Sequence, residues 1–348
     1  MSSVDLVVPC YRYGHFLREC VESALAQVGT DVRILIIDDA SPDNSAEIAT
    51  DLSKESPRVT FVQHKTNKGH IATYNEGIEW ASADYYMILS ADDYLLPGAL
   101  YRSTKLMEAH PALGWVFGRA ITFNDGFGLD HTSTGDSEGA CRIMSGLDFI
   151  RLSGARNIVP TPTVVVRTEL QKRVGGYRSE LPHTGDMELW FRLAAHSSVG
   201  ILEAAQAAYR RHSNNMSLLY TTNSWLPDLQ QRKAAINYFI RTCGDLLPEA
   251  DHIHRELSRS LACDAVGFAS SAFNNGEMGI SRQLSQFALE ECPEITRSLH
   301  WIKLICKRHI GLEKWRFLQP SIAQIHQLFS KYKQTQRTTV FGDIPRTK

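Results

Sequence analysis

The sequence predicts an α/β protein in which a mostly parallel sheet is flanked by helices and followed by an α-helical region. Two observations predict this class. In the first 125 residues, short apolar runs alternate with amphipathic stretches of helical period, which is typical of parallel strands joined by helical crossovers. From Trp225 onward, the apolar residues follow the helical period alone.

Each strand is predicted from a short run of aliphatic, β-branched or aromatic residues bounded by polar residues, glycine or proline. In chain order these runs are Val4–Val8, Val32–Ile37, Val59–Val62 and Tyr85–Leu89. The stretches of helical spacing between them are Phe16–Ala26, Ser45–Ser53 and Ile71–Ala81. Asp43, Asn44 and Ser45 are suited to cap the second helix, because such side chains accept hydrogen bonds from the first N–H groups of a helix.

The remaining elements are less regular. Residues 124–142 collect Gly, Ser, Thr and Asp and therefore predict a surface loop. After this loop we expect a strand at Thr163–Val166, a helix at Gly185–Ala195 and a strand leading into a loop at Ala207–Ser217. Later helices are expected at Leu229–Arg241, Ile253–Ala272, Ile280–Leu289 and Ser298–Lys307. These patterns place a domain boundary near residue 222, between an α/β domain, 1–222, and a helical region, 223–348.

Composition and charge are those of an ordinary globular protein. The 348 residues are 43% hydrophobic and carry 37 Lys and Arg against 38 Asp and Glu, which excludes gross disorder. No run approaches the roughly 18 apolar residues that cross a bilayer, and Asp5 stands where a signal peptide is positively charged. Seven scattered cysteines without a Cys-x-x-Cys pair favour reduced thiols. We therefore expect a cytoplasmic protein.

The charge is unevenly distributed along the chain. Residues 297–348 carry eleven Lys and Arg against two acids, a net charge of +9, which leaves −10 for the rest. Tryptophan and aliphatic residues are interleaved with these charges. Two interpretations stay open: contact with an anionic membrane surface, or a solvated basic face on a packed helix. Nucleic acid is not expected as a partner, because no recognisable binding motif accompanies the charge.

Polar residues follow the ends of the predicted parallel strands, where ligands bind in open sheets of this class. Asp38 and Asp39 follow the second strand and are suited to hydrogen-bond a nucleotide base or ribose. A turn with a helix cap is the alternative, because Asp and Ser also favour turns. Lys68 and Gly69 follow the third strand as a further candidate phosphate or base contact, although they lack a Walker pattern.

Asp92 and Asp93 follow the fourth strand. Adjacent carboxylates repel each other unless a cation or hydrogen-bond donors offset their charge. A divalent ion bound through one or two carboxylates and a substrate diphosphate fits this arrangement. An acidic turn before Pro97 remains the alternative.

Charged residues later in the chain are further candidates. Asp186 opens a predicted helix, where an acid either complements the helix dipole or serves as a catalytic acid or base, and Glu188 is a rival for that role. Arg210, Arg211 and His212 concentrate donors that suit a leaving diphosphate. His212 alternatively ligates a metal.

In order and spacing, these segments resemble the family 2 inverting glycosyltransferases, whose nucleotide-binding fold is called GT-A. The resemblance covers roughly residues 3–217. The matching segments are Val8-Pro9-Cys10-Tyr11, Ile36 to Ser41, Asn67-Lys68-Gly69, Asn75-Glu76-Gly77, Ile88 to Asp93 with Pro97, Gly175-Gly176-Tyr177, Gly185-Asp186 to Arg192, and Tyr209 to His212 with Ser217. Each segment is weakly specific alone, and their succession is what identifies the family.

The resemblance implies a GT-A-like, Rossmann-related domain at 1–222 that binds a nucleotide-diphosphate sugar. The nucleotide contacts it implies are Pro9, Tyr11, Asp38, Asp39, Lys68, Gly69 and Asp92. Asp93, together with His212, would hold a divalent metal, Mg²⁺ or Mn²⁺. Arg210 and Arg211 would lie near the diphosphate. The acid that opens the later helix is the general base of the family, which makes Asp186 the candidate.

The resemblance also implies an activity: transfer of one sugar, with inversion, from a donor whose expected nucleotide is UDP to an acceptor hydroxyl. The processive signature Gln-x-x-Arg-Trp is absent. A glycan or lipid-linked acceptor in cell-envelope polysaccharide or glycolipid biosynthesis is expected. The enzyme would then be cytoplasmic, with its basic tail suited to the inner face of the cell membrane.

Two residues depart from the family pattern, which often has Asn and Asp where this chain has Arg12 and Ser90. They keep open a catalytically inactive binding or scaffold protein of the same fold. A sugar nucleotidyltransferase is the enzymatic rival, although its Gly-rich first loop is missing. A dinucleotide-dependent dehydrogenase is disfavoured because no Gly-x-Gly-x-x-Gly follows the first strand.

Overall fold

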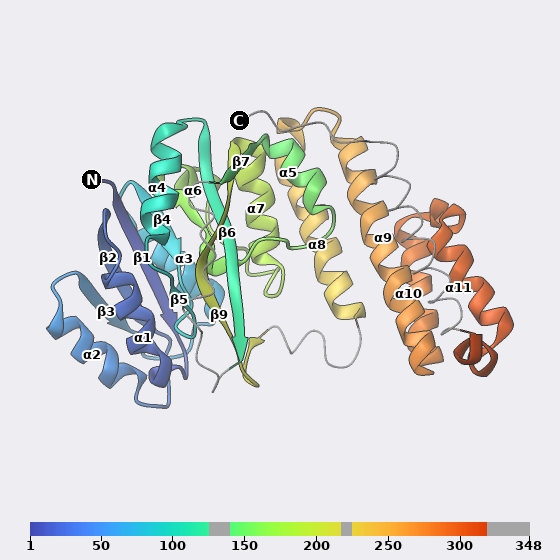
Figure 1. The fold of residues 1–348 in the computed structure, drawn as a ribbon, viewed down its shortest axis with the longest axis horizontal. Coiled ribbons are helices and arrows are strands. Elements are labelled where there is room, and N and C mark those ends of the chain that lie inside the picture. The colour runs from blue at the N-terminus through green and yellow to red at the C-terminus, as the bar shows by residue number, and fades with distance from the viewer. Residues whose placement is uncertain (125–139, 217–224, 319–348) are drawn as a thin grey trace, which may run out of the picture. The chain divides into compact units, whose positions relative to one another are not determined.

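The computed structural model describes residues 1–124, 140–216 and 225–318. The chain forms two compact units, Met1–Leu261 and Ala262–Lys348. The first unit contains a mixed sheet with the strand order β3-β2-β1-β4-β8-β6-β9-β5, in which β7 pairs with β9 (Figure 1). Helices flank this sheet and helices follow it, so the predicted α/β class is confirmed.

The first four strands are parallel and correspond to the four predicted runs. They are β1 (Ser3–Cys10), β2 (Asp31–Asp38), β3 (Val59–Gln63) and β4 (Tyr85–Ile88). β1 lies between β2 and β4, with Val8 opposite Ile36 and Val7 opposite Ile88. The apolar runs are continuous because helices cover both faces of a parallel sheet.

The crossover helices are α1 (Gly14–Leu25), α2 (Ser45–Glu55) and α3 (His70–Trp80). Residues of α1 and α2 share a buried core with Leu6 and Val8 of β1. α3 lies on the opposite face, where a Cβ on Gly77 would meet the Val7 side chain at 2.5 Å. Successive strand side chains point to opposite faces, so β1 anchors helices on both sides. All three predicted helices are confirmed.

The second half of the sheet was predicted less completely. Its strands are β5 (Tyr94–Leu95), β6 (Leu113–Asn124), β7 (Cys141–Met144), β8 (Val165–Arg167) and β9 (Ser198–Arg211). β8 runs antiparallel to both of its neighbours, whereas β6 and β9 are parallel. The strand predicted at Thr163–Val166 is confirmed in part: its first residue ends a 3₁₀ turn, Thr161–Thr163, and its last two residues belong to β8. The predicted loop at 124–142 lies largely outside the described residues.

The helices of this half include the predicted one at Gly185. They are α4 (Ala99–Ala109), α5 (Gly146–Ser153), α6 (Thr168–Val174) and α7 (Gly185–His196). The later helices, all expected from their period, are α8 (Leu226–Cys243), α9 (Ala250–Asn275), α10 (Met278–Glu291) and α11 (Leu299–Ile310). Short 3₁₀ turns at Gly244–Leu246 and Pro293–Arg297 connect some of them.

The predicted domain boundary near residue 222 lies outside the described residues and stays a prediction. The first compact unit extends to Leu261 and therefore includes α8 and the start of α9. α8 packs against α7 through Phe239 and Phe191, whose ring centroids are 5.2 Å apart. The side chain of Arg232 on α8 donates to the Ala155 carbonyl at 2.9 Å.

In the second compact unit, part of the basic segment serves its own packing. The Lys307 ammonium donates to Ser270 Oγ at 2.6 Å, and the Arg308 guanidinium donates to Ser285 Oγ at 2.7 Å. Leu299 and Phe317, in contrast, are more than 80% exposed. Across the described residues, no helix combines the length and the apolar character needed to cross a membrane. Residues 319–348 of the tail lie outside the described residues.

Candidate functional site

The loops after β1 and β2 adopt a backbone that non-glycine residues rarely take. Arg12 has a φ of 65° and Ala40 a φ of 57°, both in the left-handed region. Ser41 links the two loops, because its hydroxyl accepts a hydrogen bond from the Arg12 N–H at 3.0 Å. Strained backbone of this kind concentrates at ligand sites and persists only where the surrounding structure imposes it. Tyr11 lies in the first of these loops and is 40% exposed, whereas Pro9 belongs to β1 and is paired with Ile37 of β2.

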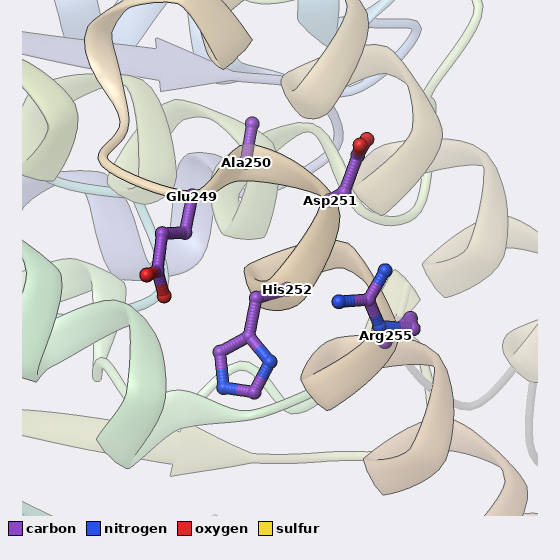
Figure 2. A pocket seen from close by; sticks show the side chains of 5 residues that line it. All are labelled: Glu249, Ala250, Asp251, His252 and Arg255. Carbon is purple, nitrogen blue, oxygen red and sulfur yellow. The ribbon is translucent and has the colours of Figure 1, made fainter.

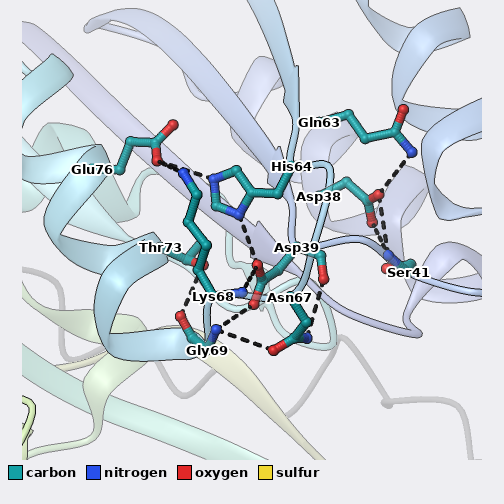
Figure 3. A network of polar contacts seen from close by, with 10 residues as sticks. All are labelled: Asp38, Asp39, Ser41, Gln63, His64, Asn67, Lys68, Gly69, Thr73 and Glu76. Carbon is teal, nitrogen blue, oxygen red and sulfur yellow. Dashed lines mark hydrogen bonds and ion pairs between the residues drawn. The ribbon is translucent and has the colours of Figure 1, made fainter.

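The carboxylate of Asp39 fixes the loop after β3 (Figure 3). It accepts the N–H groups of Lys68 at 2.7 Å and Gly69 at 2.8 Å, and it contacts His64 Nδ1 at 2.7 Å. Asp38 is also buried, and its bonds from Ser41 N–H are longer, at 3.3 Å and 3.4 Å. The structure thus brings three of the predicted nucleotide contacts, Asp39, Lys68 and Gly69, into one hydrogen-bonded cluster. Their contact with a nucleotide stays a prediction.

Replacing Asp39 with alanine is expected to lower the free energy of unfolding by about 3 kcal/mol, because it removes the acceptor of the buried His64 ring and of the Lys68 and Gly69 N–H groups. Urea denaturation measures this loss. Asp51→Ala is the control, since Asp51 is exposed and forms only a surface pair with Lys54 at 3.4 Å. Equal stabilities of the two variants would contradict the role assigned to Asp39.

Glu76 completes this cluster from α3. Its carboxylate contacts Lys68 Nζ and His64 Nε2, each at 3.0 Å. Burial raises the pKa of Glu76, but the hydrogen bonds from Lys68 and His64 outweigh burial, so the pKa is lowered overall. The Lys68 side chain is half-exposed and paired. Its ammonium is therefore held at the surface of the site by Glu76.

Asp92 and Asp93 are both buried at the turn between β4 and β5. Burial raises the pKa of both carboxyls, and the charge of Asp92 raises that of Asp93 further. The Arg210 backbone N–H donates to Asp93 Oδ1 at 3.0 Å, which is limited compensation for two adjacent acids. A bound cation would remove this electrostatic cost. The two carboxylates are therefore suitable ligands for a divalent ion.

Protein side chains alone do not complete a metal site here. In the described part of the chain, no three His, Cys, Asp or Glu side chains are grouped so that they could hold an ion. Mg²⁺ and Mn²⁺ sites with one or two carboxylates obtain their remaining ligands from substrate phosphates and water. The geometry therefore fits an ion that arrives with a diphosphate.

His212 lies against Asp92, with 3.1 Å between Nε2 and Oδ2. The Asn214 backbone N–H donates to His212 Nδ1 at 3.2 Å, which leaves the ring proton on Nε2, facing Asp92. The ring stacks on Phe16, with centroids 5.5 Å apart. The structure thus places both predicted metal ligands, Asp93 and His212, next to Asp92. Whether they bind a metal stays a prediction.

Arg210 is engaged within the protein, whereas Arg211 is exposed. The Arg210 guanidinium lies between the rings of Phe16 and Phe123, 4.3 Å and 4.7 Å from their centroids. It donates to the Asp92 carbonyl at 3.0 Å and pairs with Glu19. This arrangement favours a supporting role under the Asp92–Asp93 turn, so the predicted diphosphate contact suits Arg211 better.

Asn215 was not among the predicted site residues. Its side-chain amide donates to the Arg210 carbonyl at 3.2 Å and approaches Asp92 Oδ2 at 3.5 Å. Its side-chain oxygen, Oδ1, accepts the backbone N–H of His212 at 2.7 Å. Asn215 opens an Asn-Met-Ser triplet that resembles a glycosylation acceptor, but its side chain is buried in the site. The only sequence signal for its role is its position three residues after His212.

Asp186 lies in the first turn of α7. Its carboxylate accepts hydrogen bonds from Asn157 Nδ2 at 2.7 Å, Thr161 Oγ1 at 3.3 Å and the Met187 N–H at 2.8 Å. Burial raises its pKa, although the Met187 N–H and His183 act in the opposite direction. Asp186 is partly accessible and has no Lys or Arg partner among the described ion pairs, so its carboxylate is a reachable base with raised basicity.

Glu188, the rival acid, has a different function. Its carboxylate forms a bidentate pair with the Arg192 guanidinium, at 2.7 Å and 2.8 Å, and neither side chain is accessible to solvent. Arg192 also donates to the Gly176 carbonyl at 2.7 Å. Glu188 therefore fixes α7 against the Gly175-Gly176 segment and is not available as a base.

Tyr74 of α3 interacts with both acidic groups, the Asp92–Asp93 pair and Asp186. Tyr74 was not among the residues predicted from the sequence. Its hydroxyl is hydrogen-bonded to Ser90, one of the two departures from the family pattern. Burial raises its pKa, and the charges of Asp186, Asp92 and Asp93 raise it further. The three carboxylates therefore all lie near this one hydroxyl.

A separate hollow of about 480 Å³ lies at the start of α9, away from these residues. Glu249, Asp251, His252 and Arg255 line it, and Figure 2 shows their side chains pointing in different directions. Binding sites combine a concave surface with polar groups that converge on a ligand. The hollow lacks that convergence and is not the candidate site.

Comparison with known proteins relates the first part of this region to a sequence family. A family model described as Glycosyl transferase family 2 matches residues 5–161. An uncharacterised protein of Mycobacterium tuberculosis is 27% identical over 218 residues, which are 60% of this chain and 67% of the relative. The uncharacterised glycosyltransferase EpsJ of Bacillus subtilis is 34% identical over 105 residues, 30% of each chain. The chain thus spans from under a third to two thirds of these relatives.

Solved structures share the fold over more of the chain. Residues 1–349 of Staphylococcus aureus TarS, solved with UDP-GlcNAc, align with a TM-score of 0.64 over 92% of each chain, at 16% identity. The mannosyltransferase PcManGT of Pyrobaculum calidifontis, solved with GDP-Man and Mn²⁺, aligns with a TM-score of 0.51 over 89% of this chain and 86% of its own, also at 16% identity. At this identity, the likeness shows a GT-A-like fold.

Proposed function

Because a model of glycosyl transferase family 2 matches residues 5–161, we propose that this protein is an inverting, metal-dependent glycosyltransferase. It transfers one sugar from a nucleotide-diphosphate sugar to an acceptor hydroxyl. One observation carries the proposal: the buried Asp92–Asp93 pair, in contact with Arg210 and His212, and the separate carboxylate of Asp186, held by Asn157 and Thr161, lie in one compact unit. Inversion requires a base on one side of the transferred sugar and a leaving-group site on the other.

Asp186 is the proposed general base. Asn157 and Thr161 hold its carboxylate in one orientation, so an acceptor hydroxyl meets a fixed oxygen. The acceptor oxygen gives its proton to Asp186 and forms the bond to the anomeric carbon, while the bond to the nucleotide diphosphate breaks with its electron pair. A raised pKa makes Asp186 a better proton acceptor than an exposed Asp.

The leaving-group side belongs to Asp92, Asp93 and His212. Asp93 and Asp92 would hold the divalent ion, which supplies charge stabilisation to the departing diphosphate. His212 fixes the Asp92 carboxylate, and Arg210 supports the turn from below. The exposed Arg211 is the proposed side chain for the diphosphate oxygens. Asp38, Asp39, Lys68 and Gly69 are proposed for the nucleotide.

The proposed donor is a UDP-sugar. The two solved structures named above contain UDP-GlcNAc and GDP-Man, which supports a nucleotide-sugar donor. The proposed acceptor is a glycan or lipid-linked precursor of envelope polysaccharide or glycolipid. A cytoplasmic enzyme at the inner membrane face would meet such an acceptor. Exposed Leu299 and Phe317, in a segment that also exposes Lys303 and Lys314, support contact with an anionic surface.

A thermal-shift screen tests the proposal with UDP, GDP, dTDP and CDP, each with and without Mn²⁺. A ligand that binds only the folded state stabilises it by about 2.7 kcal/mol at a hundredfold excess over Kd. We expect one nucleotide to raise Tm in a metal-dependent manner. No shift with any nucleotide would favour the inactive binding protein of the same fold.

A further inference from the structure

The first turn of α8 contacts the loops on both sides of Asp186. Asp228 is the residue that makes this possible, because each of its carboxylate oxygens has its own partner. Oδ1 lies 2.9 Å from His183 Nε2, and Oδ2 lies 3.0 Å from Arg232 Nε. Asp228 thereby contacts the His183 turn directly and pairs with Arg232 of its own helix, which in turn reaches the Ala155 loop.

The two partners lead to opposite flanks of Asp186. Arg232 donates to the Ala155 carbonyl at 2.9 Å, and Asn157, two residues further on, donates to Asp186 Oδ2 at 2.7 Å. His183 lies three residues before Asp186, in the turn that begins α7. Asp228 therefore connects the loop that orients the Asp186 carboxylate to the turn that carries it.

The cluster is shielded from solvent. The side chains of His183, Asp228 and Arg232 are 16%, 15% and 7% exposed. Thr184 Oγ1 adds a hydrogen bond to the Gln231 carbonyl of α8 at 3.0 Å. An acid in a first helical turn also complements the helix dipole. That role requires neither His183 nor Arg232, so it does not account for the geometry.

We propose that Asp228 is a positioning residue for Asp186, which it holds in place through His183 on one side and Arg232 on the other. The inference rests on the proposed function, because Asp186 is the proposed base. It also gives α8 a task in the site: the helix carries part of the support for the reacting carboxylate.

The cluster has an electrostatic consequence for Asp186. Burial raises the pKa of Asp186, and His183 is one of the groups that lower it. The other groups that face this carboxylate are Asn157, Thr161, Tyr74 and Tyr177. Glu188 and Arg192, further along α7, are paired with each other. If Asp228 no longer orients His183, the pKa of Asp186 is expected to rise.

The first experiment follows Asp186 directly and requires no substrate. The ¹³C resonance of its carboxyl, assigned with Asp186→Asn, is titrated with pH in the wild type, Asp228→Asn and His183→Gln. We expect higher midpoints in both variants. Asp245→Asn, at an exposed acid in the same unit, is the control and should titrate as the wild type does. Unchanged midpoints in both variants would overturn the inference.

The second experiment measures kinetics as release of UDP from UDP-GlcNAc, with water as the acceptor. Misplacement of a base costs up to about 100-fold in rate, so we expect a lower kcat in Asp228→Asn with KM close to that of the wild type. In the pH–rate profile of the variant, the fall of kcat on the acid side should also occur at a higher pH than in the wild type. The double variant with His183→Gln should be no worse than the more impaired single variant. If KM rises while kcat stays at the value of the wild type, the positioning role is overturned.

The two arms separate the possible failures. If the wild type neither binds nor hydrolyses any nucleotide sugar, the proposed function fails, and the titration still decides whether Asp228 controls Asp186. If the wild type is active and both variants match it, the positioning role fails alone. Thermal unfolding of each variant shows whether it is folded. His183→Gln keeps the inference testable should Asp228→Asn not fold.

Discussion

Replacing Asp186 with asparagine is expected to slow sugar transfer by about 10²- to 10⁴-fold, the usual contribution of a correctly placed general base. Asparagine keeps the shape of the side chain and still offers an oxygen to Asn157 and Thr161. It cannot accept the acceptor's proton. The loss should therefore appear in kcat, because the proton moves only as the new bond forms.

Binding measurements distinguish lost chemistry from lost structure. Asp186→Asn should bind nucleotide and Mn²⁺ as the wild type does, because the leaving-group side is built from Asp92, Asp93 and His212. Its Tm should be equal or higher, since burial disfavours the charged Asp186 carboxylate. Asp245→Asn should match the wild type in every assay. A variant of Asp186 with near-normal kcat would show that another group is the base.

The raised pKa of Asp186 also fixes the sign of a pH effect. The base is active only when ionised, so kcat/KM should fall as the pH is lowered through this raised pKa. If Asp186 had the ordinary Asp pKa of 3.8, kcat/KM would stay unchanged down to lower pH. A pH–rate profile measured with saturating metal checks this. An acid limb that persists in Asp186→Asn would assign the titration to another residue.

The sequence predicted the first half of the sheet because each strand there is a continuous apolar run between turn residues. β9 lacks that signal, whereas β6 opens with an apolar run, Leu113 to Gly118, that was not predicted as a strand. β9 runs through Glu203 and several alanines, which have low strand propensity, and its backbone is held by long-range pairing with β6. Such pairing depends on residues 85 or so positions away, which local patterns do not encode.

In the candidate site, too, some residues could be predicted from local sequence and others depend on contacts between distant parts of the chain. Asp92, Asp93 and Asp186 could be proposed from the sequence because they follow a strand or open a helix within the succession of family-like segments, although turns and helix dipoles use acids at the same positions. Asn215 and Asp228 were not, since the contacts that matter join them to Asp92 and His183, far away in the chain. Arg210 was recognised as part of the site, but only the structure shows its guanidinium held between two aromatic rings.

Replacing Asp93 with asparagine is expected to stabilise the metal-free protein while abolishing its stabilisation by nucleotide and Mn²⁺. The folded-state pKa of Asp93 is raised by burial and by Asp92. A carboxyl with a raised folded-state pKa favours folding when protonated, and that stability is lost as the pH rises through the raised value. At neutral pH the carboxyl is ionised in the unfolded state and disfavoured as an ion in the folded state, so Asp93 costs stability that asparagine avoids. Asparagine also keeps an oxygen for the Arg210 N–H.

The gain should be on the order of 1 kcal/mol, as for other substitutions that relieve strain at a functional site. Urea denaturation without metal should show it near neutral pH. The difference should narrow as the pH is lowered and vanish below the ordinary pKa of 3.8, where Asp93 is protonated in the folded and the unfolded protein. With nucleotide and Mn²⁺ the order should reverse, because the wild type gains the binding free energy and the variant does not. A metal-free variant less stable than the wild type would mean that the fold itself supports the Asp93 charge. The site would then have no electrostatic demand for a cation.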